Sequence, residues 1–181
     1  MFRDSPGDMM WGAVFTALLL IACATDIRTR RIPNPLVIVI GAGGFVHSIA
    51  TRPLGPAIWH SAGGLTLGLA IWILFWVGGM LGAGDVKLFA SAGAWLGPPA
   101  TWRAALVAAL VGGVLALAVV IRRRQLGMAT QRLALVLSSR SLAVLRPTES
   151  ADLAHRRQHL PYGVALAAGA IAAAWIPGLF S

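Results

Sequence analysis

The sequence predicts an all-α protein, a polytopic membrane bundle of about six transmembrane helices in a single domain over residues 1–181. Hydrophobic residues make up 57% of the chain and charged residues only 12%, whereas a soluble domain carries about 25% charged residues. Six apolar runs divide the chain. A water-soluble fold of this size could not hide so much apolar surface, so we expect its solvent to be lipid. In lipid each segment must satisfy its own backbone groups, which favours helices over open strands.

The apolar runs cover residues 9–25, 35–51, 58–80, 86–99, 102–121 and 162–180. A spanning helix needs about 20 residues, and about 17–25 is usual. The third, fifth and sixth runs meet this length easily, and the first two are acceptable. The fourth is short, and we expect it to thin the bilayer locally or to begin below the interface, with Lys87 extending its amine towards water.

The first run also has features of a signal peptide, because Leu20-Ile21-Ala22-Cys23 is similar to a lipoprotein cleavage box. The tail before the run is not positive, since Asp4 and Asp8 outweigh Arg3. The arginine cluster over 28–31 follows the run instead of preceding it. We therefore expect this run to be retained as the first span.

The distribution of basic residues predicts the orientation of the bundle. If the N-terminus lies outside and six helices alternate, the loops at 26–34, 81–87 and 122–161 face the cytoplasm. These loops hold twelve of the fifteen basic residues: Arg28, Arg30, Arg31, Lys87, Arg122, Arg123, Arg124, Arg132, Arg140, Arg146, Arg156 and Arg157. The sequence therefore predicts a cytoplasmic side that also carries Asp26 and Asp85.

The long loop over 122–161 alternates leucine and valine with arginine between residues 131 and 146. That pattern is typical of an interfacial helix whose arginines contact anionic lipids, and a basic linker without structure is an equally open interpretation. The formal charge of +9 fits membrane orientation better than nucleic-acid binding, because the arginines lie between apolar spans.

Small residues recur inside the spans. Gly64 and Gly68 form one Gly-x-x-x-Gly pattern, and Gly93 and Gly97 form another. Such faces let helix backbones approach closely in lipid. We interpret them as contacts within the bundle, and homodimerisation stays open as the alternative.

Two of the six acidic residues stand at the edges of apolar spans. Asp26 follows the first run, and Asp85 lies in a glycine-rich turn before the fourth. Asp26 alone is explained by an ion pair with Arg28 or Arg30, and Asp85 alone by a helix N-cap. Two such acids on one side of the membrane favour a functional site. The remaining acids are most simply solvated surface charges: Asp4, Asp8, Glu149 and Asp152.

Paired carboxylates suit the hydrolysis of an amide without a metal. One carboxylate activates water as a base, and the other protonates the carbonyl oxygen and then the leaving amine. At about 3 Å two carboxylates cannot both ionise, so they share one proton. Gly82 and Gly84 would let a substrate backbone approach. Lys87 is placed either to offset the charge of the pair or to reach the interface.

Neither a metal nor a cofactor is expected. Cys23 is the only cysteine, which excludes a zinc site built on cysteine pairs. His155 and His159 have the spacing of one helical turn, but no neighbouring acid or cysteine completes a ligand set. The chain has no P-loop, dinucleotide fingerprint or Gly-x-Ser-x-Gly turn.

Three segments resemble the prepilin peptidase family of bacterial membrane aspartic proteases. The first is Asp26-Ile27-Arg28-Thr29-Arg30-Arg31-Ile32-Pro33-Asn34, which is similar to a first catalytic aspartate followed by an Ile-Pro-Asn loop. The second is Gly82-Ala83-Gly84-Asp85-Val86-Lys87-Leu88, which resembles the Gly-x-Gly-Asp motif and its lysine. The third is Leu160-Pro161-Tyr162-Gly163, similar to the Pro-aromatic-Gly opening of the last helix.

The resemblance implies a catalytic pair formed by Asp26 and Asp85. It implies supporting roles in the active-site loops for the residues of the two motifs: Gly82, Gly84, Lys87, Pro33 and Asn34. The implied substrates are prepilins or pseudopilins, whose short basic leaders end in glycine and precede an apolar helix. Cleavage would occur at the cytoplasmic face of the bacterial inner membrane.

Long members of the family carry an N-terminal region with cysteine pairs and also methylate the new N-terminus. This chain starts almost directly with its first predicted helix and has no cysteine pair. The resemblance therefore implies a peptidase without methyl transfer, similar to the short forms of Flp or tight-adherence pilus systems.

Three other interpretations remain open. The acids could be structural ion pairs in a non-enzymatic subunit of a pilus or secretion assembly. They could bind a proton or cation in a small carrier, although carriers place their site near the bilayer midplane. A presenilin-like protease, which also uses Gly-x-Gly-Asp, would cut helices within the bilayer.

Overall fold

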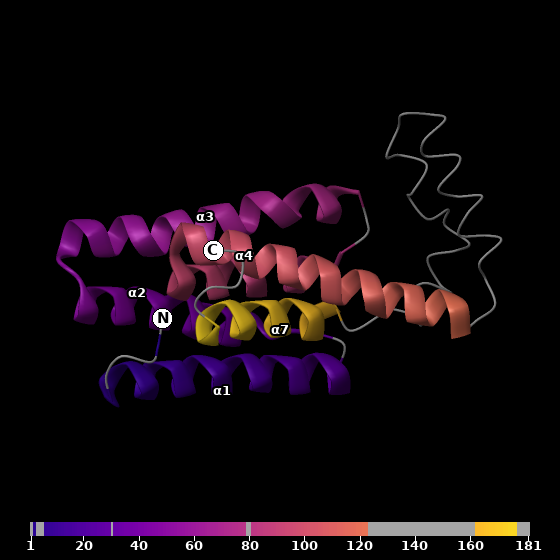
Figure 1. Cartoon of the computed structure of the whole chain (residues 1–181), viewed down its shortest axis with the longest axis horizontal. Helices are drawn as coiled ribbons and strands as arrows, with labels where there is room; N and C mark the ends of the chain where they lie inside the picture. The colour runs from indigo at the N-terminus through magenta and orange to yellow at the C-terminus, as the bar shows by residue number, and fades with distance from the viewer. Residues whose placement is uncertain (1, 3–5, 30, 79–80, 123–161, 177–181) are drawn as a thin grey trace.

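The structure, a computed structural model, describes residues 2, 6–29, 31–78, 81–122 and 162–176, and within these ranges it contains helices and no strand. The helices are α1 (Pro6–Thr29), α2 (Asn34–Thr51), α3 (Leu54–Val77), α4 (Ala83–Arg122) and α7 (Tyr162–Trp175). They form a bundle in which α1 and α7 lie side by side and α4 packs against α2, α3 and α7 (Figure 1). The predicted all-α membrane bundle is therefore confirmed.

Four of these helices are long and apolar enough to cross a membrane: α1, α2, α3 and the Ala83–Leu115 part of α4. Large apolar side chains such as Ile38, Leu74 and Leu110 are exposed on the outside of the bundle, as expected for surfaces that face lipid. Helix α7 is shorter, with 14 residues. The total of six spans stays a prediction, and the interfacial helix over 131–146 lies outside the described residues.

Local sequence signals explain where the helices begin and end. Helix α1 carries Asp8 in its first turn and Arg28 in its last, which complements the helix dipole. Helix α2 starts after Pro33, an extended residue with φ −62° and ψ 132°. The Pro33 carbonyl accepts hydrogen bonds from the backbone N–H groups of Leu36 and Val37, at 3.1 and 3.3 Å.

The long helix α4 is interrupted at Gly97, which adopts φ 71° and ψ 169°. A positive φ of this size favours glycine, and Pro98 and Pro99 follow directly. Proline removes a backbone donor and moves the preceding residue out of the helical region. The Thr101 hydroxyl donates a hydrogen bond to the Gly97 carbonyl oxygen at 2.8 Å and so ties the two sides of the break together.

The break divides α4 into a first arm, which precedes Gly97, and a second arm, which follows it. The two arms run in opposite directions. Asp85, in the first arm, and Gly112, in the second, both lie beside the first turn of α7, against Gly163 and Tyr162 respectively. Asp85 and Gly112 therefore lie at the same end of the bundle, and Gly97 lies at the other end. The arms correspond to the fourth and fifth predicted runs, and the first arm ends at the break instead of at residue 99.

Helix α3 and the first arm of α4 touch through their backbones. A Cβ on Gly64 would overlap the carbonyl oxygen of Gly93, and a Cβ on Gly68 would lie 3.1 Å from the Cα of Ala90. Only glycine permits this approach. The structure thus confirms the interpretation of Gly64 and Gly93 as packing positions within the bundle.

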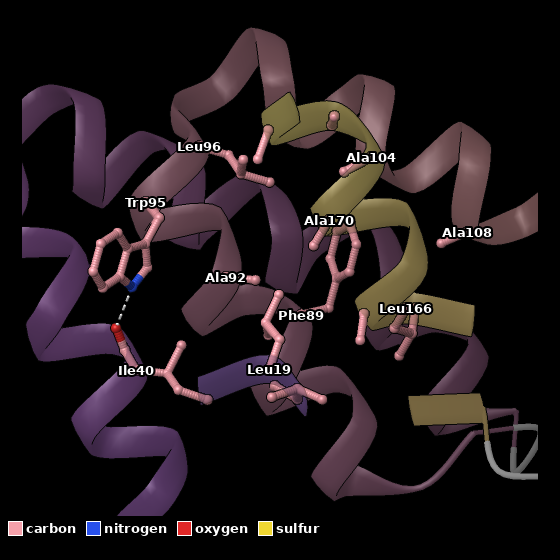
Figure 2. Packing of buried hydrophobic residues seen from close by; sticks show 14 of the residues in the cluster. Leu19, Ile40, Phe89, Ala92, Trp95, Leu96, Ala104, Ala108, Leu166 and Ala170 are labelled. Carbon is pink, nitrogen blue, oxygen red and sulfur yellow. Dashed lines mark hydrogen bonds between the residues drawn. The ribbon is translucent and has the colours of Figure 1, made fainter. Parts of the chain in front are cut away.

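The interior of the bundle is built around Trp95, which is fully buried near the end of the first arm. Its indole stacks on His47 with ring centroids 5.5 Å apart and lies 5.3 Å from the Phe15 ring. Its Nε1 donates a hydrogen bond to the Ile40 carbonyl oxygen at 2.7 Å, drawn as the dashed line in Figure 2. Trp95 therefore joins α2 to α4 by packing and by a polar contact.

We expect Trp95→Phe to lower the free energy of unfolding by about 1–3 kcal/mol, because it removes a buried hydrogen bond and leaves unfilled space. Trp59→Phe is the matched control, since Trp59 is 80% exposed and should change stability little. Thermal unfolding in detergent, followed by tryptophan fluorescence, compares the two variants. Equal melting temperatures would contradict the role given to Trp95.

Candidate active site

Several helix ends lie close together at one end of the bundle. Helix α1 finishes there, α2 and α4 begin there, and α7 begins there with Tyr162 (Figure 1). Two acidic residues lie at this end: Asp26 from α1 and Asp85 from α4. Both side chains are partly buried.

Asp26 lies one turn before the end of α1 and faces α7. Cys23, one turn earlier on the same side of α1, has its Sγ 3.8 Å from the Gly163 carbonyl oxygen. The Thr29 hydroxyl lies 2.8 Å from the Thr25 carbonyl oxygen and 3.0 Å from that of Arg31, which closes the end of the helix. The Cys23 contact places this side of α1 beside the start of α7.

Asp85 belongs to the first turn of α4, where the helix dipole favours a negative charge. The backbone N–H groups of Asp85 and Val86 donate to the Gly82 carbonyl oxygen at 3.1 and 3.3 Å. A Cβ on Gly82 would lie 3.2 Å from Asp85 Oδ2, a tight contact, whereas one on Gly84 would make an ordinary van der Waals contact with Ile32 Cβ at 3.5 Å. Gly82 therefore leaves room for the Asp85 carboxylate beside the turn.

The two carboxylates converge on Gly163 in the first turn of α7. A Cβ placed on this glycine would lie 2.9 Å from Oδ2 of Asp26 and 3.4 Å from Oδ1 of Asp85. The two oxygens are therefore separated by no more than the sum of these distances. Residues far apart in the sequence are brought within reach of a single water molecule or peptide group.

A pocket of about 360 Å³ opens at this end of the bundle. Its walls combine the two acids with two exposed cationic side chains, Arg31 and Lys87. The lining residues are Asp26, Arg31, Ile32, Asn34, Gly82, Ala83, Gly84, Asp85 and Lys87. The Lys87 amine lies 3.5 Å from the Asn34 side-chain oxygen, across the mouth formed by α2 and α4.

Most of the residues predicted for the site line this pocket: Asp26, Asp85, Gly82, Gly84, Lys87 and Asn34. Pro33 does not line it, and serves instead to start α2. Four residues at the site were not predicted as site residues: Gly163, Ile32, Arg31 and Ala83. Tyr162-Gly163 at the start of a run was the available signal for Gly163, whereas Ile32 is an apolar residue that lines the pocket and lies beside Gly84.

No three His, Cys, Asp or Glu residues form a group that could hold a metal ion within the part of the chain that the structure describes. His155 and His159 lie outside those ranges, and the expectation of a metal-free reaction stays a prediction. His47 and His60 lie at the opposite end of the bundle, where His47 packs on Trp95 and His60 approaches Gly97.

The long apolar helices and the two carboxylates gathered at one end of the bundle define a multi-pass membrane protein with a pair of acids in a pocket. The model of the type IV leader peptidase family matches residues 13–120, which include both aspartates and the break in α4. The chain therefore belongs to the type IV leader peptidase family.

Curated relatives agree with this assignment. The chain is 34% identical over 121 residues to a prepilin leader peptidase/N-methyltransferase of Pectobacterium carotovorum, which covers 62% of this chain and 42% of the relative. It is 32% identical over 116 residues to the corresponding protein of Dickeya chrysanthemi, covering 59% of this chain and 40% of that protein. The chain thus spans about two fifths of the length of these relatives. No solved structure matches it significantly.

Proposed function

We propose that the chain is a membrane aspartic peptidase that removes the leader peptide from type IV prepilins or pseudopilins at the cytoplasmic face of the bacterial inner membrane. One observation carries the proposal. Asp26 and Asp85 approach Gly163 from two different helices, with carboxylate oxygens 2.9 and 3.4 Å from the position of its absent Cβ. The family membership and the relatives' names support the leader of a prepilin as the substrate.

In the proposed reaction the two carboxyl groups share one proton. The ionised carboxylate takes a proton from water as the oxygen attacks the scissile carbonyl, while the protonated carboxyl donates its proton to the carbonyl oxygen. The resulting tetrahedral diol collapses when the proton held by the first carboxyl passes to the leaving amine. The second carboxyl recovers its proton from the diol, so the pair returns to its starting state. The pair acts as a unit, and no base is assigned to one aspartate.

Acid–base chemistry fits the pocket better than a thiol mechanism. The sulfur of Cys23 is directed towards the Gly163 carbonyl oxygen. The two histidines within the described ranges, His47 and His60, pack at the other end of the bundle against Trp95 and Gly97. A cysteine nucleophile needs a base within hydrogen-bond reach, and neither of these two histidines is placed to be one, whereas the two carboxylates both face Gly163.

The size and position of the pocket fit an extended peptide. Its volume of about 360 Å³ accommodates a short stretch of chain but not a folded domain. Its walls come from the ends of α1, α2 and α4, so a peptide would enter from the end of the bundle instead of from between the helices. This entry supports cleavage at the membrane edge over cleavage within a bilayer-spanning helix.

The decisive experiment is mass spectrometry of a candidate prepilin co-expressed with the wild-type chain or with Asp85→Ala. We expect a new N-terminus directly after the leader glycine with the wild-type chain only. An unprocessed prepilin with both proteins would contradict the proposal for that substrate, and processing by Asp85→Ala would contradict the role of the pair.

The same spectra test the prediction of a peptidase without methyl transfer. The relatives are named as leader peptidase and N-methyltransferase, whereas the sequence motifs predict the peptidase activity alone. We expect the mature product to carry a free, unmethylated amine. A product heavier by one methyl group, absent from cells without the chain, would contradict this.

A further inference from the structure

Gly163 differs from the other buried glycines in what its missing side chain leaves open. Around Gly64, Gly93 and Gly169, an added Cβ would meet the backbone of a neighbouring helix. Around Gly163 the three nearest atoms that a Cβ would meet are Asp26 Oδ2, Asp26 Cγ and Asp85 Oδ1. The space beside this glycine is thus bounded by the two carboxylates and not by the backbone of a neighbouring helix.

We propose that Gly163 is a positioning residue for the carboxylate pair: its lack of a side chain lets both acids reach the same point on α7 and leaves room for the water that they activate. This inference rests on the proposed peptidase function. It assigns α7 to the active site, alongside the two helices that carry the aspartates.

Helix α7 is anchored along its length, so it cannot retreat to make room for a larger residue. Near its start, a Cβ on Gly112 would already lie 3.0 Å from the Tyr162 ring. Further along, Gly169 lies so close to α4 that a Cβ there would be 2.5 Å from the Ala104 carbonyl oxygen. At its end, the Trp175 Nε1 donates a hydrogen bond to the Thr16 hydroxyl at 3.0 Å.

A methyl group at position 163 must therefore displace the carboxylate of Asp26. A carbon-to-oxygen distance of 2.9 Å is shorter than van der Waals contact, and the flexible Asp26 side chain is the part that can move. The displacement alters the spacing of the pair and takes up the space of the water. The contacts that hold the helices together are left unchanged.

We expect Gly163→Ala to lower kcat for prepilin cleavage on the order of 10²-fold, the effect of moving a reacting group by about 1 Å. KM should stay within about threefold, because the peptide-binding walls of the pocket are untouched, and the melting temperature in detergent should stay close to that of the wild-type protein. Gly169→Ala, the same substitution on the same helix, should lower the melting temperature instead, because its Cβ would lie 2.8 Å from Ala108 Cβ.

Several outcomes separate this role from its alternatives. Wild-type kcat in Gly163→Ala would overturn the inference, and so would a loss of activity accompanied by the same fall in melting temperature as in Gly169→Ala. If Gly163→Ala does not fold, Asp26→Ala/Gly163→Ala should fold as well as Asp26→Ala, because the opposing carboxylate is gone; failure of this double variant would make Gly163 a packing residue. A wild-type chain that cleaves no prepilin would instead reject the proposed function itself.

Discussion

Asp26→Asn and Asp85→Asn are each expected to slow prepilin cleavage by roughly 10³-fold, the range attributed to a positioned acid or base. Asparagine keeps the shape of the side chain but can neither accept the proton of water nor hold the proton that the leaving amine needs. Both variants should remain in the membrane in normal amounts. The rate is measured as the fraction of prepilin processed over time, with purified protein in detergent.

Asp8→Asn supplies a matched control for this pair of variants. Asp8 is an aspartate on the same helix as Asp26, but it lies in the first turn of α1, at the far end from the pocket. Its replacement should leave cleavage unchanged. Normal processing by either Asp26→Asn or Asp85→Asn would contradict the proposed mechanism.

The non-enzymatic alternative makes a different prediction for the same variants. If Asp26 and Asp85 only formed structural ion pairs, their replacement would lower the melting temperature, and charge-reversed pairs with Arg28 or Lys87 would restore function. The Lys87 amine donates a hydrogen bond to the Asn34 side-chain oxygen at 3.5 Å. Asn variants with a wild-type melting temperature and no cleavage would therefore favour catalysis over a scaffold.

The helices could be predicted because lipid imposes a simple rule on the sequence. A segment that crosses the bilayer must be apolar over its whole length, so the runs are visible without knowledge of packing. The ends of the helices are predicted less accurately, since α1 begins at Pro6 and the predicted run begins at residue 9. First turns are made from capping and charged residues such as Asp8, which a search for apolar runs passes over.

The aspartates could be predicted for the same reason, because an acid at the edge of an apolar span is costly and therefore conspicuous. Their meeting point could not. It depends on the register of α7, which is set by the contact of Gly169 with Ala104 and by the hydrogen bond of Trp175 to Thr16. These contacts join residues that are far apart in the chain, and no local pattern encodes them.

Gly64→Ala is expected to lower the free energy of unfolding by about 3 kcal/mol, the upper end of the usual cost of overpacking. Alanine is intrinsically better than glycine in a helix by about 0.5–1 kcal/mol, but this gain is smaller than the cost of the clash. A Cβ on Gly64 would overlap the Gly93 carbonyl oxygen. The position of a Cβ is fixed by its own backbone, and the Gly93 oxygen is a backbone atom. No side-chain rotation therefore relieves the overlap, and α3 must move away from the first arm of α4.

The same displacement should reach the active site, because the first arm of α4 carries Asp85. Gly64→Ala should therefore slow cleavage even in the fraction that stays folded. Gly113→Ala is the control: nothing lies within 4 Å of a Cβ at that position, so only the small gain in helix propensity remains. Thermal unfolding in detergent and prepilin cleavage are measured on both variants. A Gly64→Ala protein as stable and as active as Gly113→Ala would mean that backbone contact between α3 and α4 does not hold Asp85 in place.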